Sequence, residues 1–235
     1  MKTIPPIAFG FDFDHTLGVD NGLERKALFA YATELGHPLD PHDAAVRKQL
    51  EDILADFRAG TTSLDEMIAC FARSIGAHPA NARTARWQQH CYDLVDELVR
   101  PLDGARDVLA ALRAHAIATA ILTNGWTPLQ QKKIARALGA DARTMTILVS
   151  DEIGAVKPSR AAFDALVAAL GVSRERVWYV GDNARGDVAG ALAAGLRAVW
   201  FNWENQSYPQ DLPTPTLTIA ALRELTKLAE NTIAP

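Results

Sequence analysis

The stretch Phe-Gly-Phe-Asp-Phe-Asp at residues 9–14 decides the fold, because it joins a hydrophobic strand to two acidic side chains. Successive side chains of a strand point to opposite faces, so the phenylalanines share one face and Asp12 and Asp14 share the other. The apolar residues 7–13 predict a buried strand with both aspartates at its carboxyl end. In open α/β sheets, ligands bind at this end of the strands.

Four further runs rich in valine, isoleucine and aromatic residues predict buried strands, at residues 117–122, 146–149, 177–180 and 198–201. Apolar residues at helical spacing lie between these runs, around residues 108–112, 134–138, 163–170 and 188–192. This alternation predicts an α/β fold with a Rossmann-like core, a parallel sheet of five strands. After a proline-rich connection, a closing helix is expected over residues 220–230.

The long segment between the first and second predicted strands shows only helical periodicity. Turn-rich segments divide it into about four helices, at residues 36–38, 60–63 and 76–79. We therefore expect a helical-bundle domain at residues 17–100, inserted after the first strand. The α/β core domain would then consist of residues 1–16 and 101–235.

Composition and charge exclude several classes of partner. The chain has 235 residues, of which 49% are hydrophobic and 22% charged, and a formal net charge of -4 with scattered basic residues. Because the basic residues are scattered, the sequence shows no basic patch of the kind that binds a nucleic acid polymer or an anionic membrane. The first residues lack the pattern of a signal peptide, and we expect a cytoplasmic protein. Cys70 and Cys91 are expected to be buried free thiols.

More acidic residues and a lysine follow the later strands. Asp182 and Asp187 come after the fourth predicted strand, and Lys157 follows the third. If the sheet is as predicted, these side chains converge with Asp12 and Asp14 at one edge. Like charges ~4 Å apart repel by roughly 4 kcal/mol at an effective dielectric of 20, so the cluster needs a cation or bound protons. Oxygen ligands favour Mg²⁺ over zinc.

Each of these residues also has a simpler interpretation. An Asp-x-Asp sequence is common in turns, Asp182 would serve in a turn, and Asp187 would stabilise a helix N-terminus. Lys157 alone would be a solvated surface residue. Their joint occurrence in this order along the chain is what these separate interpretations leave unexplained.

The chain resembles the haloacid dehalogenase-like hydrolase superfamily in four motifs that span most of its length. Residues 11–17 resemble the first motif, Thr123-Asn124-Gly125 the second, Lys157-Pro158 the third, and residues 181–187 the fourth. The helical insert looks like the cap of that family. The surroundings of the second and third motifs are similar to the subgroup with nucleotide 5'-monophosphatases and N-acylneuraminate-9-phosphatase.

The resemblance implies roles for the acidic residues. Asp12 would attack phosphorus to form an aspartyl phosphate, and Asp14 would act as general acid and then as general base. Magnesium would be held by the Asp12 side chain, the Asp14 backbone carbonyl and the Asp182 side chain. Asp187 would contact these ligands without touching the ion itself, or it would bind the ion through a water.

The resemblance also implies contacts to the substrate. Thr123 and Asn124 would bind the transferring phosphoryl oxygens, and Lys157 would neutralise charge on Asp12 and phosphate. Trp126 is a candidate for a contact to the leaving group, or else a core residue. Arg58 of the insert is a second candidate, or else a solvated arginine at a helix end. The role of His15, between the two aspartates and Thr16, stays open.

The function expected from these features is that of a magnesium-dependent phosphatase for small phosphorylated metabolites, of the nucleotide or sugar phosphate class. Dehalogenases of the superfamily lack the second aspartate of the first motif, which this chain has as Asp14. A phosphomutase of the β-phosphoglucomutase type is an alternative enzyme. A phospho-accepting signalling module is the alternative that is not an enzyme, although the long helical insert argues against it.

Overall fold

The computed structural model describes residues 7–58 and 61–227. The chain divides into two compact units, Met1–Val19 with Arg100–Pro235, and Asp20–Val99. The first unit contains the sheet and the second is helical. Within the described ranges, no helix is both long and apolar enough to cross a membrane.

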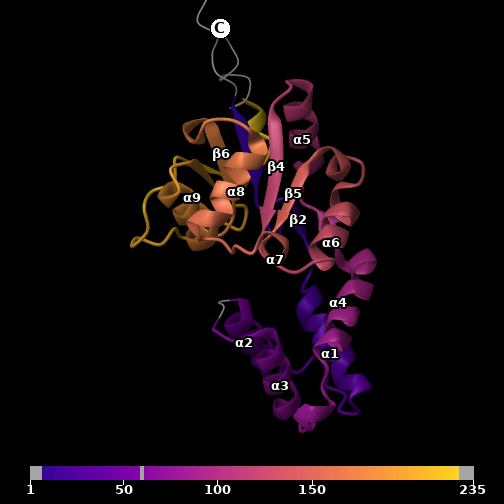
Figure 1. Cartoon of the computed structure of the whole chain (residues 1–235). Helices are drawn as coiled ribbons and strands as arrows, with labels where there is room; N and C mark the ends of the chain where they lie inside the picture. Colours follow the sequence, from indigo (N-terminus) through magenta and orange to yellow (C-terminus); the bar gives the residue numbers. More distant parts are fainter. Residues whose placement is uncertain (1–6, 59–60, 228–235) are drawn as a thin grey trace, which may run out of the picture. The chain divides into compact units, whose positions relative to one another are not determined.

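The core unit is built on a parallel sheet of six strands in the order β5-β4-β1-β6-β7-β8. Their bounds are β1 Ala8–Phe11, β4 Ala118–Thr123, β5 Thr146–Val149, β6 Val177–Gly181, β7 Arg197–Phe201 and β8 Leu217–Ile219. Each pair of neighbours is parallel, and β1 lies between β4 and β6 in the interior. The predicted fold class is confirmed, and Figure 1 shows helices packed against the strands.

The sheet has six strands where the sequence predicted five. The additional strand, β8, is the edge strand beside β7 and contains only Leu217, Thr218 and Ile219. Three residues are too few to give an alternating or continuous apolar pattern. Helical structure resumes at residue 224, and the rest of the expected closing helix lies outside the described residues.

Helices connect the strands of the core. They are α5 Ala105–Ala114, α6 Leu129–Leu138, α7 Ser150–Ile153, α8 Arg160–Leu170 and α9 Gly190–Ala193, with the π-helical segment Ala184–Ala189 before α9. Short 3₁₀ turns occur at Asp141–Thr144 and Arg174–Arg176. A two-residue antiparallel ladder joins β2 Gly18–Val19 to β3 Arg100–Pro101, where the chain leaves the core and returns to it.

Close packing at the centre of the sheet requires a glycine at position 10. A Cβ atom there would lie 2.5 Å from Leu166 Cδ2 and 2.9 Å from Tyr179 Cδ2. The missing side chain lets α8 and the Tyr179 ring pack directly on β1. The ring of Phe163 then meets the Tyr179 ring edge to face, with centroids 5.1 Å apart.

The described residues of the helical unit form four helices and a 3₁₀ turn. They are α1 Leu23–Glu34, α2 Ala44–Arg58, α3 Leu64–Ser74, η1 Pro79–Asn81 and α4 Thr84–Leu98. Leu28, Tyr31 and Phe71 are among its fully buried side chains. Cys70 and Cys91 are not joined in a disulfide, and only Cys91 is buried; the expectation of a buried Cys70 was wrong, because it lies on the exposed side of α3.

A charged cluster joins α1 to α4. Glu34 accepts two hydrogen bonds from the Arg86 guanidinium, both 2.8 Å long, and its Oε2 also lies 2.8 Å from His90 Nε2. The hydrogen bond from Arg86, helped by His90, lowers the pKa of the Glu34 carboxyl to about 2. The ionised form of Glu34 therefore stabilises the folded unit.

We expect Glu34→Gln to lower the denaturant midpoint of the protein at pH 7. Because the Glu34 pKa is lower in the folded than in the unfolded chain, its contribution is complete above the ordinary value of 4.5 and is lost as the pH falls toward about 2. Unfolding followed by circular dichroism between pH 7 and 3 should show wild type and variant converging. Glu97→Gln, at an exposed position of α4, is the control; an equal effect of that variant would contradict the assignment.

Candidate active site

A buried lysine gathers three side chains at the carboxyl ends of β1 and β6. Lys157 Nζ donates to Asp12 Oδ1 at 2.6 Å, to Asp187 Oδ1 at 2.7 Å and to the Tyr179 hydroxyl at 3.0 Å. Asp12, Lys157 and Asp187 are 6%, 7% and 1% exposed. Each ammonium proton therefore has an acceptor, and Lys157 is not the solvated residue of the simpler interpretation.

Burial and crowding shift the pKa values of these groups. Burial raises the pKa of the Asp12 carboxyl well above its ordinary value; Lys157 opposes this rise and the nearby carboxylates add to it. Burial, and then the charge of Asp187, raise the pKa of Asp182 to about 7. Burial acts to lower the pKa of Lys157, but Asp12 and Asp187 together outweigh it, and that pKa lies well above its ordinary value. The cluster holds more carboxylates than Lys157 can balance.

The donor set could hold a divalent metal ion. One oxygen each of Asp12, Asp182 and Asp187 can be chosen so that all three lie within 4.8 Å of one another. Carboxylate oxygens are the ligands that Mg²⁺ prefers, and a divalent cation would offset the excess negative charge. Both oxygens of Asp187 already accept hydrogen bonds, Oδ1 from Lys157 and Oδ2 from Asn183 N at 3.0 Å. The supporting role expected for Asp187 stays a prediction.

The loop after β6 places Asp182 and Asp187. A Cβ atom at Gly181 would lie 2.4 Å from Asp187 Cγ, so glycine is needed for this close approach. Asp182 N donates to Thr16 Oγ1 at 3.2 Å, and the indole of Trp200 donates to the Asp182 carbonyl at 2.9 Å. Thr16 is fully buried and was not among the predicted site residues. Its position within the first motif was the available signal.

Asn124 holds the backbone of Lys157. Its Nδ2 donates to the Lys157 carbonyl at 3.0 Å, and its Oδ1 accepts from Lys157 N at 2.9 Å. The Asn124 side chain, which was expected to bind phosphoryl oxygens, is thus hydrogen-bonded to the backbone of Lys157 in the third motif. Thr123, at the end of β4, is 1% exposed, and its hydroxyl accepts from Gln130 Nε2 at 2.8 Å.

Asp14 has partners of its own. Gln130 Nε2 donates to Asp14 Oδ2 at 2.7 Å, and Lys133 Nζ forms an ion pair with Asp14 Oδ1. The Asp14 side chain is 29% exposed, whereas Gln130 and Lys133 are 3% and 4% exposed. Sequence reasoning missed both partners. The available signal was that they fall on the same face of α6 as Ile134 and Ala137, a face expected to be apolar.

Comparisons with known proteins identify the family of the chain. The family model described as haloacid dehalogenase-like hydrolase matches residues 8–195. The chain belongs to the haloacid dehalogenase-like hydrolases. This membership confirms the predicted family, and it excludes the alternative of a signalling module that is not an enzyme. The expected enzyme class, a phosphoric monoester hydrolase, is consistent with this family and its relatives.

Two curated relatives and one solved structure illustrate the family. Pyrimidine 5'-nucleotidase YjjG of Escherichia coli is 32% identical over 93% of this chain and 95% of its own length. Ribulose-1,5-bisphosphate 5-phosphatase of Halopiger xanaduensis is 29% identical over 84% of this chain and 85% of its own. The putative hydrolase YfnB of Bacillus subtilis, solved bound to magnesium, has a TM-score of 0.76 at 24% identity, covering 95% of this chain and 98% of that one. The last likeness shows the fold alone.

Two candidates for contacts to the leaving group of this hydrolase remain, Trp126 and Arg58. Trp126 is partly exposed, and its buried Nε1 has no hydrogen-bond partner among the described residues. In the helical unit, Arg58 pairs with Glu24 at 2.7 Å and with Glu51 at 3.6 Å, so its guanidinium is already engaged. Roles for Trp126 and Arg58 at the leaving group stay predictions.

His15 has an unusual backbone, with a φ of 59°. The indole Nε1 of Trp203, beyond the end of β7, donates to the His15 carbonyl at 2.9 Å. The two rings stack with centroids 6.4 Å apart. The His15 side chain thus packs against Trp203 and helps to hold the turn that follows Asp14.

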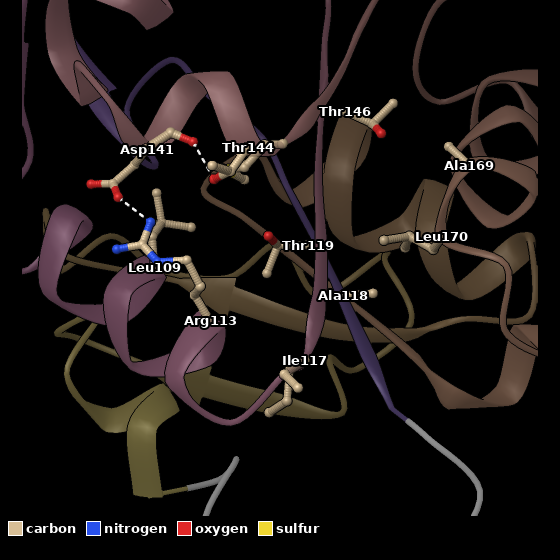
Figure 2. A pocket seen from close by; sticks show the side chains of 12 residues that line it. Leu109, Arg113, Ile117, Ala118, Thr119, Asp141, Thr144, Thr146, Ala169 and Leu170 are labelled. Carbon is tan, nitrogen blue, oxygen red and sulfur yellow. Dashed lines mark hydrogen bonds and ion pairs between the residues drawn. The ribbon is translucent and has the colours of Figure 1, made fainter.

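A pocket of about 300 Å³ lies elsewhere in the core, at the amino ends of β4 and β5. Its walls include Ala118, Thr119 and Thr146, and Figure 2 shows Arg113 paired with Asp141 beside them. No predicted site residue lines it. We therefore place the candidate active site at the carboxyl ends of the strands, around Asp12.

We expect Tyr179→Phe to destabilise the protein by about 1–3 kcal/mol, because buried partners would be left unpaired. The Tyr179 hydroxyl accepts from Lys157 and donates to the Leu122 carbonyl at 2.9 Å. Urea unfolding of wild type and variant measures the difference. Tyr208→Phe is the matched control, since its hydroxyl donates to Pro213 at a solvent-accessible place. If the Tyr179 variant lost no more stability than the control, the buried hydroxyl would not contribute the expected free energy.

Proposed function

We propose that the chain is a magnesium-dependent phosphatase that hydrolyses small phosphate monoesters through an aspartyl phosphate on Asp12. The observation that carries the proposal is the different environment of the two aspartates of the first motif. Asp12 is buried and paired with Lys157, whereas Asp14 is partly exposed and held by Gln130 and Lys133. These environments support the assignment of Asp12 as the nucleophile and of Asp14 to proton transfer.

The reaction has two displacements at phosphorus. In the first, an oxygen of Asp12 bonds to phosphorus, the bond from phosphorus to the ester oxygen breaks, and Asp14 gives a proton to the departing alcohol. In the second, a water oxygen bonds to phosphorus and gives a proton to Asp14. The bond from phosphorus to Asp12 then breaks, and inorganic phosphate leaves.

Charge balance is the task of the surrounding residues. Lys157, next to Asp12, offsets negative charge as the phosphate ester approaches. Asp12 and Asp182, with the Asp14 backbone carbonyl and support from Asp187, would hold magnesium, which when bound stabilises charge on the phosphoryl oxygens. The Thr123 hydroxyl, at the end of β4, is proposed to contact the phosphoryl group.

The proposed substrates are nucleotide or sugar phosphates. The relatives named as a pyrimidine 5'-nucleotidase and a ribulose-1,5-bisphosphate 5-phosphatase support these two classes. The role of the helical unit as a cap and the cytoplasmic location stay predictions. A phosphomutase would use the same groups but return the phosphoryl group to a sugar. Release of free phosphate in a single turnover, measured during a screen of phosphorylated metabolites, separates the two enzymes.

We expect p-nitrophenyl phosphate to be hydrolysed in the presence of Mg²⁺, and the activity to be lost in EDTA and restored by added Mg²⁺. Asp12→Asn should reduce turnover to background, because an amide oxygen is a poor nucleophile for phosphorus. Release of p-nitrophenol measures both effects. Activity that persists in EDTA, or in the Asp12 variant, would refute the mechanism.

We expect Asp14→Asn to lower kcat by about 10²–10⁴-fold, the usual contribution of general acid–base catalysis. Magnesium binding should be retained, because the ligand proposed at this residue is its backbone carbonyl. Steady-state kinetics and calorimetric titration with Mg²⁺ measure the two quantities. Unchanged turnover would remove Asp14 from proton transfer.

A further inference from the structure

Two polar side chains occupy the buried face of α6. Gln130 and Lys133 are one turn apart on this helix and are almost completely buried, beside Ile134 and Ala137. Burying an amide and an ammonium group costs free energy unless both find partners. Both side chains contact one carboxylate, that of Asp14.

The amide of Gln130 links three parts of the site. Its Nε2 lies 2.7 Å from Asp14 Oδ2, 2.8 Å from Thr123 Oγ1 and 2.9 Å from the Asn124 carbonyl. The carboxylate and the carbonyl can only accept hydrogen bonds, so the amide must present its nitrogen to them. Its Oε1 is buried without a hydrogen-bond partner among the described residues, which is the cost of this orientation.

Gly125 of the second motif makes room for this amide. A Cβ atom at position 125 would lie 2.6 Å from Gln130 Cγ, and the φ of Gly125 is 146°. A side chain there would displace Gln130 and strain the backbone. The glycine next to Asn124 is therefore matched to the glutamine on α6.

Lys133 holds the other oxygen of the same carboxylate. Its ammonium group pairs with Asp14 Oδ1 and lies 5.9 Å from the centroid of the Phe13 ring. The Asp14 carboxylate is thus held at Oδ2 by Gln130 and at Oδ1 by Lys133. Two contacts from one helix restrict the rotation of a side chain that is otherwise partly exposed.

We propose that Gln130 and Lys133 are positioning residues that hold the Asp14 carboxyl group where it can exchange a proton with the leaving oxygen. This inference rests on the proposed phosphatase function and deepens it. Neither residue needs to touch the substrate. Both act through Asp14, and Gln130 also ties Asp14 to the Thr123 hydroxyl.

The test compares two aryl esters that differ in their need for a proton. p-Nitrophenolate leaves without one, whereas the leaving oxygen of phenyl phosphate needs general acid help. We expect Gln130→Leu and Lys133→Met to lower kcat/KM for phenyl phosphate by about 10²-fold, the scale of a small misplacement of a catalytic group. For p-nitrophenyl phosphate kcat/KM should change much less. Lys133→Arg, which keeps the cation, should restore much of the lost activity.

A double-mutant cycle shows whether the residues act through Asp14. In the Asp14→Asn background, Gln130→Leu and Lys133→Met should cause no further loss, because the group that they position is gone. Gln131→Leu and Lys132→Met, next to them on α6, are the matched controls and should leave both esters unaffected. Circular dichroism confirms that each variant is folded, and Gln130→Met replaces Gln130→Leu if that variant is not.

Equal losses on both esters, or losses that multiply with that of Asp14→Asn, would overturn the positioning role and leave the phosphatase proposal intact. No turnover of either ester by the wild type with Mg²⁺ would overturn the phosphatase proposal, and this inference with it. These two failures are therefore distinguishable.

Discussion

The buried ammonium group of Lys157 is the interaction on which the rest of the site depends. Removing an ion from water costs several kcal/mol, so Lys157 can occupy this place only with its acceptors in position. Those acceptors come from the residue that follows β1, from β6 and from the segment after β6. The reciprocal bonds from Asn124 fix the lysine backbone, and the absent side chains at Gly10 and Gly181 allow Tyr179 and Asp187 to come close enough. The close packing of the sheet is therefore also what brings the acceptors to Lys157 and balances its charge.

A second buried lysine, Lys133, gives Asp14 an environment different from that of Asp12, only two residues away. Asp12 shares Lys157 with Asp187, whereas Asp14 is paired with Lys133. Because side chains alternate in an extended strand, Asp12 and Asp14 lie on the same face. Each is nevertheless paired with a different lysine, which gives the two carboxylates different electrostatic environments. Exposure differs as well, since Asp12 is buried and Asp14 meets solvent. Neighbouring carboxylates in one short segment can thus take different chemical roles.

The sequence predicted those parts of the molecule that depend on local patterns. The buried strands, the helical insert and the gathering of acidic residues at one edge follow from apolar runs and from the direction of parallel strands. Strand β8 was missed because Leu217–Ile219 is too short to show a period. Partners across the fold were missed for a different reason: the bonds from Gln130 to Asp14 and from Asn124 to Lys157 join residues 116 and 33 positions apart. Residue type and spacing do not encode which distant group a polar side chain meets.

The small ladder of β2 and β3 has a consequence for how such proteins diversify. Gly18 and Val19 pair with Pro101 and Arg100, and Leu102 N donates to the Leu17 carbonyl at 3.0 Å. Paired antiparallel residues lie about 5 Å apart, so the outgoing and returning chains are fastened together at the border of the core. Any segment inserted between β2 and β3 therefore begins and ends at the same fixed place on the core. Evolution can lengthen, shorten or replace that sequence while the registers of β1 and β4, and the aspartates and threonine at their ends, stay where they are.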